Sequence, residues 1–189
     1  MTLELPLEVT LDAATERDAA VLTNLLELYV HDMTETFPAI EIGADGRFGY
    51  HPLTPYWSEP ARRFAFLVRL GGKLAGFILA TRGSPVSADP EVLDIAEFFI
   101  LRGVRRSGVG RRAARLLWDR LSGLWTVRVS ERNLGALPFW SRVITEYSAG
   151  CAVQTERPGK PYAWRVFSFE ANAASGREQR PWRKRLGPQ

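Results

Sequence analysis

A basic, glycine-containing turn is the part of this sequence best suited to bind a ligand. It reads Arg-Arg-Ser-Gly-Val-Gly-Arg from Arg105 to Arg111, between a predicted strand and a predicted helix. Gly108 and Gly110 would let the backbone approach a ligand closely and adopt unusual φ angles. The first N–H groups of a helix lack internal partners and lie at the positive end of its dipole, and the arginines add charged donors. The turn therefore predicts an anion site.

The spacing of the glycines limits which anion this site would take. The turn is not Gly-x-Gly-x-x-Gly with an acidic residue on a following strand, so a dinucleotide is not indicated. It is also not the Gly-x4-Gly-Lys-Ser/Thr loop that cradles nucleoside triphosphates. We expect a pyrophosphate with a further phosphate nearby, as in coenzyme A.

Glu97 is the candidate proton acceptor, because it is an acid inside an otherwise apolar predicted strand. Burial would raise the pKa of its carboxyl group toward the range that is useful for a general base. The alternation that starts at Ile95 places Glu97 and Phe99 on one face of the strand. The other face would carry Ala96, Phe98 and Ile100. The alternative is that Glu97 forms a structural ion pair with an arginine.

A wall of aromatic and polar residues is predicted upstream of the turn. Its members are Tyr29, His31 and Asp32 at the end of the first predicted helix, and Tyr50, His51, Tyr56 and Trp57 in the following loop. An aromatic, partly acidic pocket suits a cationic amine. The alternatives are that Tyr29 belongs to the core, that His31 and Asp32 pair at the helix end, and that Trp57 anchors the loop.

Hydrophobic periodicity and turn signals predict the elements that position these residues. The expected strands are 7–11, 64–70, 73–81, 92–101, 124–129, 151–156 and 162–169. The expected helices are 15–32, with a short helical piece to Phe37, then 108–121 and 134–144. Residues 38–60 are predicted to form a long loop. This order indicates an α/β or α+β hybrid with a mixed, mostly antiparallel sheet of about six to seven strands and helices on both faces.

The charge of the chain is unevenly distributed. Residues 171–189 hold five basic residues and one acidic residue, so their net charge is +4. This equals the net charge of the whole chain. Residues 1–170 are therefore neutral overall, which argues against nucleic-acid binding by the folded body. We expect one domain over 1–170 and a basic, disordered tail over 171–189.

The expected compartment is the cytoplasm. Cys151 is the single cysteine, so the chain has no internal disulfide and no thiolate metal cluster. The first residues lack the basic start of a signal peptide. No apolar run approaches the roughly 18 residues that a membrane-spanning helix needs.

The turn resembles the signature of the GNAT family of N-acetyltransferases, Gln/Arg-x-x-Gly-x-Gly/Ala after the fourth strand, at residues 105–110. One strand later, the sequence from Asn133 to Trp140 is similar to the family's Asn-x-x-Ala-x-x-Phe-Tyr segment. The element order over residues 7–169 also resembles the family. The stretches EFFILRGVRRSGVG, LYVHD and LAGFILA resemble a bacterial subgroup of predicted acetyltransferases.

The resemblance implies that acetyl-CoA is the cofactor and that an amine attacks its thioester directly, without an acyl-enzyme. It assigns the pantetheine arm to the backbone near Phe98, Phe99 and Ile100. It assigns the pyrophosphate to Arg105, Arg106, Ser107, Gly108, Val109, Gly110 and Arg111. Asn133 would contact the arm or order the loop after the fifth strand, and Trp140 would lie at the cofactor. The acceptor would be a small-molecule or peptide amine at Tyr29, His31, Asp32, Tyr50 and Trp57. Homodimers are frequent in this family.

The candidate catalytic residues are Glu97 as base and Tyr147 as acid. Trp140 stands where the family often has a tyrosine, and an indole N–H is not a usable acid. Tyr147 is the nearby substitute, and protonation by solvent is the alternative. The departure at Trp140 motivates a second hypothesis, a non-catalytic acyl-CoA-binding sensor. A third hypothesis is that the basic tail binds nucleic acid or an acidic partner.

Overall fold

The computed structural model of the chain describes residues 7–50 and 52–172. By their internal contacts these residues form two compact units. The first unit comprises residues 7–82 and 95–116, and the second comprises 83–94 and 117–172. No helix in these described ranges is long and apolar enough to cross a membrane.

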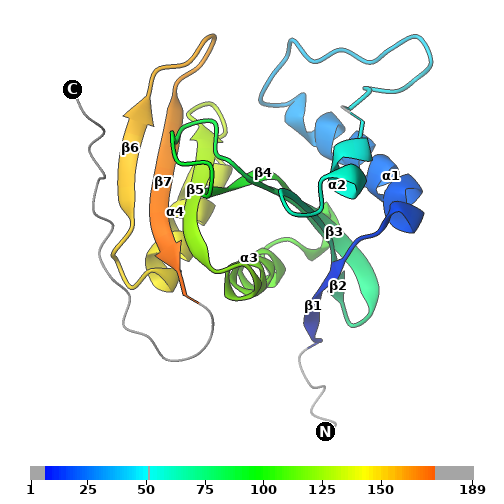
Figure 1. Cartoon of the computed structure of the whole chain (residues 1–189). Coiled ribbons are helices and arrows are strands. Elements are labelled where there is room, and N and C mark those ends of the chain that lie inside the picture. Colours follow the sequence, from blue (N-terminus) through cyan, green and yellow to red (C-terminus); the bar gives the residue numbers. More distant parts are fainter. Residues whose placement is uncertain (1–6, 51, 173–189) are drawn as a thin grey trace, which may run out of the picture. The chain divides into compact units, whose positions relative to one another are not determined.

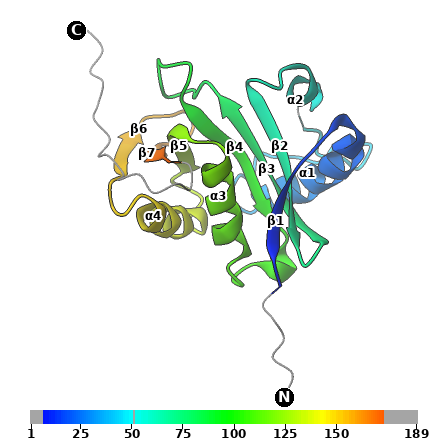
Figure 2. The ribbon, with the colours of Figure 1, turned by 60° about the horizontal axis from the view of Figure 1, so that its bottom comes forward.

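The first unit is built on an antiparallel sheet of β1 (Val9–Ala13), β2 (Arg63–Leu70) and β3 (Lys73–Arg82), followed by most of β4 (Leu93–Ile100). Figures 1 and 2 show β1, β2 and β3 next to one another. Gly71 and Gly72 join β2 to β3 with φ angles of 55° and 76°. Two consecutive positive φ angles suit a tight hairpin turn, so the predicted hairpin is confirmed.

Gly76 explains how β3 and β4 lie so close together. A Cβ atom at this position would stand 2.0 Å from the carbonyl oxygen of Phe99. Leu101, just after β4, donates its backbone N–H to the carbonyl of Ala75 at 2.9 Å. Glycine at position 76 therefore lets the backbone of β4 approach β3.

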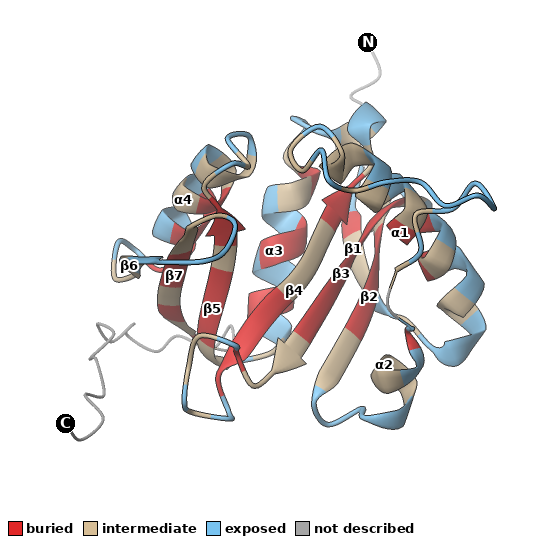
Figure 3. Cartoon of the chain, turned by 90° about the horizontal axis from the view of Figure 1, so that it is seen from above, coloured by how far each residue is buried: buried red, intermediate tan, exposed pale blue. Residues whose placement is uncertain are grey.

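The helix α1 (Ala19–Met33) supplies the core of the first unit, after the short 3-10 turn η1 (Glu16–Asp18). Leu22, Leu25 and Leu26 of α1 are buried against strand residues that include Phe77 and Phe99. Figure 3 shows buried residues along the middle of β2 and β3. The apolar side of this helix thus faces the sheet.

The second unit contains the start of β4, β5 (Gly123–Ser130), α4 (Ala136–Tyr147), β6 (Val153–Arg157) and β7 (Trp164–Ala171). β4 pairs in parallel with β5 at Leu93 and Asp94, and β7 pairs antiparallel with both β5 and β6. Trp118, Trp125 and Phe169 are among its largest fully buried side chains. The hydrogen-bonded order of the seven strands is β1-β2-β3-β4-β5-β7-β6, so the predicted mixed, mostly antiparallel sheet is confirmed.

Several element boundaries differ from the prediction. The helical piece expected to reach Phe37 is a hydrogen-bonded turn, in which Phe37 donates its N–H to the carbonyl of Met33. The loop predicted for 38–60 contains the short helix α2 (Thr54–Ser58), so that prediction was wrong in part. Five residues are too few to show helical periodicity, and a proline in the first turn is their one helix signal.

Two further differences concern burial and the end of the domain. In α3 (Val109–Arg120), the apolar side chain of Leu116 is exposed, whereas Trp118 is fully buried. β7 includes Ala171, which is buried and lies one residue beyond the predicted end of the domain. The rest of the predicted tail, residues 173–189, lies outside the described residues.

Candidate functional site

The predicted anion turn follows β4 through the 3-10 turn η2 (Arg102–Val104) and leads into α3. Arg106 and Gly108 have φ angles of 65° and 84°. A Cβ atom on Gly108 would meet nothing within 4 Å, so this position needs glycine for its φ angle and not for space. The unusual backbone that the sequence predicted is therefore present at Gly108. The same prediction was wrong for Gly110, which lies in the first turn of α3 and has no positive φ angle.

The start of α3 leaves backbone donors outside the helical hydrogen-bond ladder. Its first bond from residue i to residue i−4 runs from the N–H of Arg112 to the carbonyl of Gly108, at 3.1 Å. The N–H groups of Val109, Gly110 and Arg111 precede this bond and have no carbonyl four residues back within the helix. They lie at the positive end of the helix dipole, beside the exposed side chains of Arg106 and Arg111. This geometry is suitable for an anion.

The guanidinium of Arg105, which is predicted to contact phosphate, also makes contacts within the protein. Its Nε donates to the carbonyl of Ile100 at 2.7 Å, and its guanidinium also pairs with Oδ2 of Asp32. The same guanidinium lies 5.6 Å from the ring centroid of Phe99. These contacts hold the turn against the end of β4 and against α1.

Asp32 is a tether for this turn. Its Oδ1 accepts a 2.9 Å hydrogen bond from Nε of Arg102, and its Oδ2 pairs with Arg105. Arg102 also pairs with Glu35 at 2.8 Å. Both carboxylate oxygens of Asp32 are therefore engaged by arginines. This arrangement favours a positioning role over the acceptor contact predicted for Asp32.

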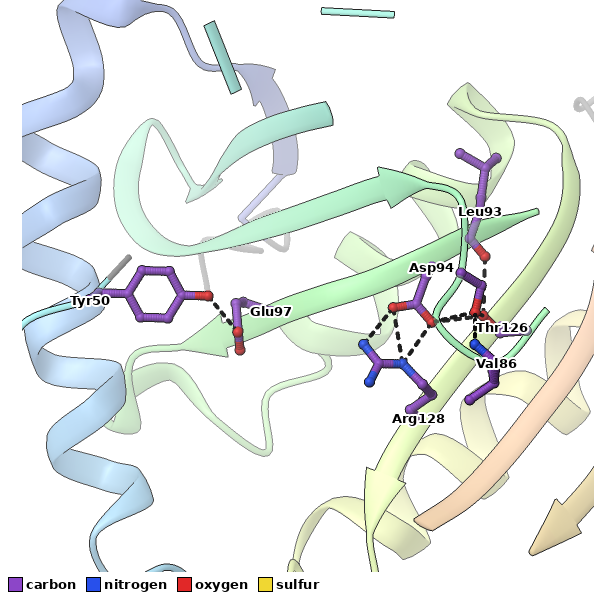
Figure 4. Close-up of polar contacts among 8 residues, drawn as sticks. Tyr50, Val86, Leu93, Asp94, Glu97, Thr126 and Arg128 are labelled. Atoms are coloured by element: carbon purple, nitrogen blue, oxygen red, sulfur yellow. Dashed lines mark hydrogen bonds and ion pairs between the residues drawn. The ribbon is translucent and has the colours of Figure 1, made fainter. Parts of the chain in front are cut away.

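Glu97 meets two tyrosine hydroxyls on the face of β4 that also carries Phe99. The hydroxyl of Tyr50 donates to Oε1 of Glu97 at 2.6 Å (Figure 4). Tyr29 packs edge-on against Phe99 and Phe77, with ring centroids 6.0 and 5.9 Å apart. Burial, together with the charge and hydrogen bonding of Glu97, raises the pKa of both Tyr29 and Tyr50 above the usual range. Both phenols therefore stay protonated and act as hydrogen-bond donors.

A pocket of about 490 Å³ opens beside these three residues. It is enclosed by the end of α1, the loop after it, and Glu97 of β4. Its lining residues are Tyr29, Val30, Met33, Phe37, Ile40, Phe48, Gly49, Tyr50, Pro52 and Glu97. The pocket thus places one carboxylate in a wall of aromatic and aliphatic side chains, which is the arrangement expected of a small-ligand site.

The loop segment that carries Tyr50 is held to α1 by Glu27. The N–H of Phe48 donates to Oε2 of Glu27 at 2.8 Å, and Nε of Arg47 lies 3.4 Å from Oε1. The hydrogen bond from Phe48 lowers the pKa of Glu27. A second pocket, of about 590 Å³, lies on the Glu27 side of this segment and shares Phe48, Gly49, Tyr50 and Pro52 with the first.

Two other described residues of the predicted wall, His31 and Trp57, have contacts of their own. His31 is exposed, with its ring centroid 6.1 Å from that of Phe48. Trp57, on α2, packs against the core of the first unit, which matches the alternative that it anchors the loop. His51 lies outside the described residues.

Asn133 and Trp140 belong to the second unit. The side-chain oxygen of Asn133 accepts from the N–H of Ala136 at 3.1 Å and so orders the loop that leads into α4. This is the second of the two roles considered for Asn133. Trp140 is buried, with its ring centroid 4.9 Å from Phe139 and 6.3 Å from Trp118. Its described contacts are those of a core residue.

Tyr147 is also part of the core of the second unit. Its hydroxyl donates to Oδ1 of Asp119 at 3.0 Å and lies 3.5 Å from the carbonyl oxygen of Asn172. Its ring centroid is 4.8 Å from that of Trp118. These contacts favour a structural role for the hydroxyl over the acid role predicted for it.

A buried charge network in the second unit was missed by the sequence reasoning. The side chain of Asp94 is 1% exposed and pairs with Arg128 at 2.8 Å (Figure 4). Its Oδ1 also accepts from the hydroxyl of Thr126 at 2.7 Å. Strand alternation does not reveal a partner more than 30 residues away. The network ties the start of β4 to β5, where those two strands pair.

The sequence matches the family model of the acetyltransferase (GNAT) family over residues 22–143. This range is more than half of the 189-residue chain. The chain belongs to the acetyltransferase (GNAT) family, and the family predicted from the turn is confirmed. A comparison with curated proteins gives no match.

Solved structures with the same fold include acetyltransferases with bound ligands. The structure of yncA from Salmonella typhimurium, with its cofactor acetyl-CoA, is 12% identical with a TM-score of 0.59, over 89% of this chain and 96% of that chain. The aminoglycoside acetyltransferase AAC(6')-Ib, in complex with coenzyme A and kanamycin, is 17% identical with a TM-score of 0.59, over 84% and 94%. Spermidine N-acetyltransferase from Vibrio cholerae, with CoA and spermine, is 13% identical with a TM-score of 0.57, over 86% and 95%.

Proposed function

We propose that this protein transfers an acetyl group from acetyl-CoA to a primary amine, by direct attack of the amine in a ternary complex. The observation that carries the proposal is the carboxylate of Glu97 in the wall of a pocket, on the same strand that leads into the anion turn. One strand then carries both a candidate base and the approach to a phosphate site. Membership in the acetyltransferase (GNAT) family supports this function.

The turn at the start of α3 fits the pyrophosphate of the cofactor. The N–H groups of Val109, Gly110 and Arg111 and the positive φ of Gly108 support this assignment. Arg106 and Arg111 would add charge. The backbone of 98–100 would bind the amide groups of the pantetheine arm. When bound, acetyl-CoA supplies the thioester carbonyl that the amine attacks.

Glu97 would bind the incoming amine and then take its proton. An alkyl amine is an ammonium at neutral pH and must lose a proton before it can attack a carbonyl carbon. The hydrogen bond from Tyr50 fixes Oε1 of Glu97, so the carboxylate is oriented before the amine arrives. The raised pKa of Tyr50 and of Tyr29 keeps both hydroxyls as donors to the carboxylate.

Thiol release from acetyl-CoA in the presence of amines tests the proposal. Wild type is expected to release thiol with at least one primary amine, and Glu97→Gln is expected to bind acetyl-CoA without turning it over. Glu91→Gln is the control, because Glu91 is an exposed acid in the second unit. Turnover by Glu97→Gln at the wild-type rate would contradict the role of Glu97.

A second candidate is a sensor that binds acyl-CoA without turnover. The engaged hydroxyl of Tyr147 and the buried indole of Trp140 favour it, because neither is placed as a proton donor for a leaving thiolate. The sensor account predicts calorimetric binding of acetyl-CoA with no thiol release for any amine. A homodimer remains a prediction from the resemblance, and sedimentation of the purified chain tests it. A cytoplasmic location remains a prediction from the single cysteine and the N-terminal sequence.

A further inference from the structure

We propose that the amine acceptor carries a single positive charge on an otherwise apolar body. This inference rests on the proposed function and names the class of acceptor that the pocket beside Glu97 takes. Such an acceptor differs from those bound in two of the solved structures, because kanamycin and spermine carry several ammonium groups.

The charge of the pocket supports one ammonium group. Among the described residues that line it, Glu97 is the one with a charged side chain. Its Oε1 atom accepts a hydrogen bond from the hydroxyl of Tyr50 at 2.6 Å, and this neutral donor brings no compensating positive charge. A cation in this pocket would pair with Glu97 and could lie against the faces of the aromatic rings. These described lining residues offer no second carboxylate for a second cation.

Three acids on α1 and the turn after it, Glu27, Asp32 and Glu35, are already engaged. Asp32 has both oxygens paired with Arg102 and Arg105, and Glu35 pairs with Arg102. Glu27 holds the N–H of Phe48 and the guanidinium of Arg47. A polyamine would have to displace one of these contacts to pair its next ammonium group with any of these three acids.

The remaining wall of the pocket is apolar. Beyond Glu97 and the two tyrosines, it consists of Val30, Met33, Phe37, Ile40, Phe48, Gly49 and Pro52. An aryl or alkyl body gains free energy by leaving water for such a surface. A second ammonium group there would lose its hydration without a compensating partner. The wall therefore selects for an apolar body as well as against further charge.

A carboxylate next to the amine would also be rejected. A free amino acid carries its carboxylate on the carbon that bears the ammonium, so binding would bring that carboxylate toward Glu97. The chemistry fits an aralkyl or alkyl monoamine. It equally fits the N-terminus of a peptide that begins with an apolar residue, because there the carboxyl group is an amide. The two sources share one apolar monoammonium group.

Acetylation of five matched amines tests the inference. They are 2-phenylethylamine, phenylalanine, the peptide Phe-Gly-Gly, spermidine and kanamycin, each compared by kcat/KM with acetyl-CoA. We expect 2-phenylethylamine or Phe-Gly-Gly to exceed spermidine, kanamycin and phenylalanine by about tenfold or more. A preference between the first two identifies the source of the amine. Equal or higher kcat/KM for spermidine or kanamycin would overturn the inference.

Binding separates failure of this inference from failure of the proposed function. Calorimetry with the protein saturated with coenzyme A measures the affinity of the same amines without turnover. If no amine is acetylated but 2-phenylethylamine or Phe-Gly-Gly binds about tenfold more tightly than spermidine, the function fails and the pocket assignment stands. If spermidine binds as well as both, the pocket assignment fails whatever the activity.

A charge added to the pocket wall gives a converse test. Ile40→Asp places a second acid in the lining, so the variant is expected to use a linear terminal diamine (octamethylenediamine) about tenfold better, relative to octylamine, than wild type does. The measurement is the ratio of the two kcat/KM values. Ile42→Asp is the matched control, because Ile42 is 58% exposed and lies outside the lining. Met33→Glu is the second variant if Ile40→Asp does not fold by circular dichroism. An unchanged ratio in a folded lining variant would contradict the inference.

Discussion

The hydroxyl of Tyr50 and the carboxylate of Glu97 form a 2.6 Å hydrogen bond between residues 47 positions apart. Tyr50 belongs to the loop that forms one wall of the pocket, and Glu97 belongs to β4, which leads into the anion turn. The candidate base is thus oriented by a residue of the acceptor wall. Changes in the loop are therefore expected to reach the chemistry as well as the binding of the amine.

Tyr50→Phe removes this hydrogen bond and keeps the ring. A hydrogen bond to a charged group contributes about 1.5–3 kcal/mol, so kcat/KM for the amine is expected to fall by roughly 10- to 100-fold. The Kd of acetyl-CoA, measured by calorimetry, should stay at the wild-type value. Tyr162→Phe serves as control, because Tyr162 belongs to the second unit and its hydroxyl bonds to Arg132. Equal losses in both variants would contradict an orienting role for Tyr50.

Tyr50 also predicts how stability changes at alkaline pH. Its folded-state pKa lies above the unfolded value near 10, so above pH 10 the unfolded chain loses a proton that the folded chain retains. The contribution of Tyr50 to the free energy of unfolding is therefore complete below pH 10 and decreases as the pH rises above 10. In Tyr50→Phe the slope of the unfolding free energy between pH 10 and 11 should be smaller than in wild type, by up to about 1.4 kcal/mol per pH unit. Urea titrations at each pH measure this slope, and identical slopes would contradict the raised pKa.

Glu27→Gln is expected to loosen the loop segment that carries Tyr50. The variant weakens the bonds to the N–H of Phe48 and to Arg47, so the pocket wall is less well positioned. We expect KM for the amine to rise about three- to tenfold while the affinity for acetyl-CoA does not change. Glu41→Gln changes an exposed acid in the same loop and should be silent. A loss of acetyl-CoA binding in Glu27→Gln would show that the segment does more than shape the acceptor pocket.

Asp32→Asn decides between the two roles considered for Asp32. If Asp32 tethers Arg102 and Arg105, the variant should bind acetyl-CoA about tenfold more weakly, because the turn before α3 is then no longer held to α1. Both arginines are partly exposed, so the cost in stability should be only about 1 kcal/mol. A contact with the acceptor would instead raise KM for the amine and leave acetyl-CoA binding intact.

Asp94→Asn tests the buried network of the second unit. Removing one partner of a buried ion pair typically costs about 3–5 kcal/mol, because the other charge is left without compensation. The double variant that combines Asp94→Asn with Arg128→Met should lose less unfolding free energy than the two single variants lose in sum. Chemical denaturation of the four proteins gives the coupling. Additive effects would show that Asp94 and Arg128 stabilise the unit independently.

The sequence predicted the strands and the positive φ angle of Gly108 well, for local reasons. Gly71 and Gly72 specify a hairpin between two apolar runs, and Gly108 takes the positive φ that its place before α3 requires. Such features depend on neighbours in the chain. The alternation along β4 likewise placed Glu97 and Phe99 toward the same tyrosine-rich side.

The partners of individual side chains were harder to predict because they come from distant segments. Asp32 and Arg105 are 73 residues apart, and nothing local shows that they pair. The sequence grouped Asp32 with Tyr29 on one helix end, whereas the structure uses Tyr29 at Glu97 and Asp32 at the turn. Tyr147 was selected for being close in sequence to Trp140, and its hydroxyl instead meets Asp119.

The central claim is that Glu97 accepts the proton of an amine that attacks acetyl-CoA. The most direct measurement is the rate of thiol release at neutral pH with saturating acetyl-CoA and 2-phenylethylamine, for wild type and Glu97→Gln. We predict turnover by wild type and a kcat lower by about 10²- to 10⁴-fold in the variant, with an unchanged Kd for acetyl-CoA. Equal kcat values for the two proteins, or no thiol release by wild type with any primary amine, would contradict it.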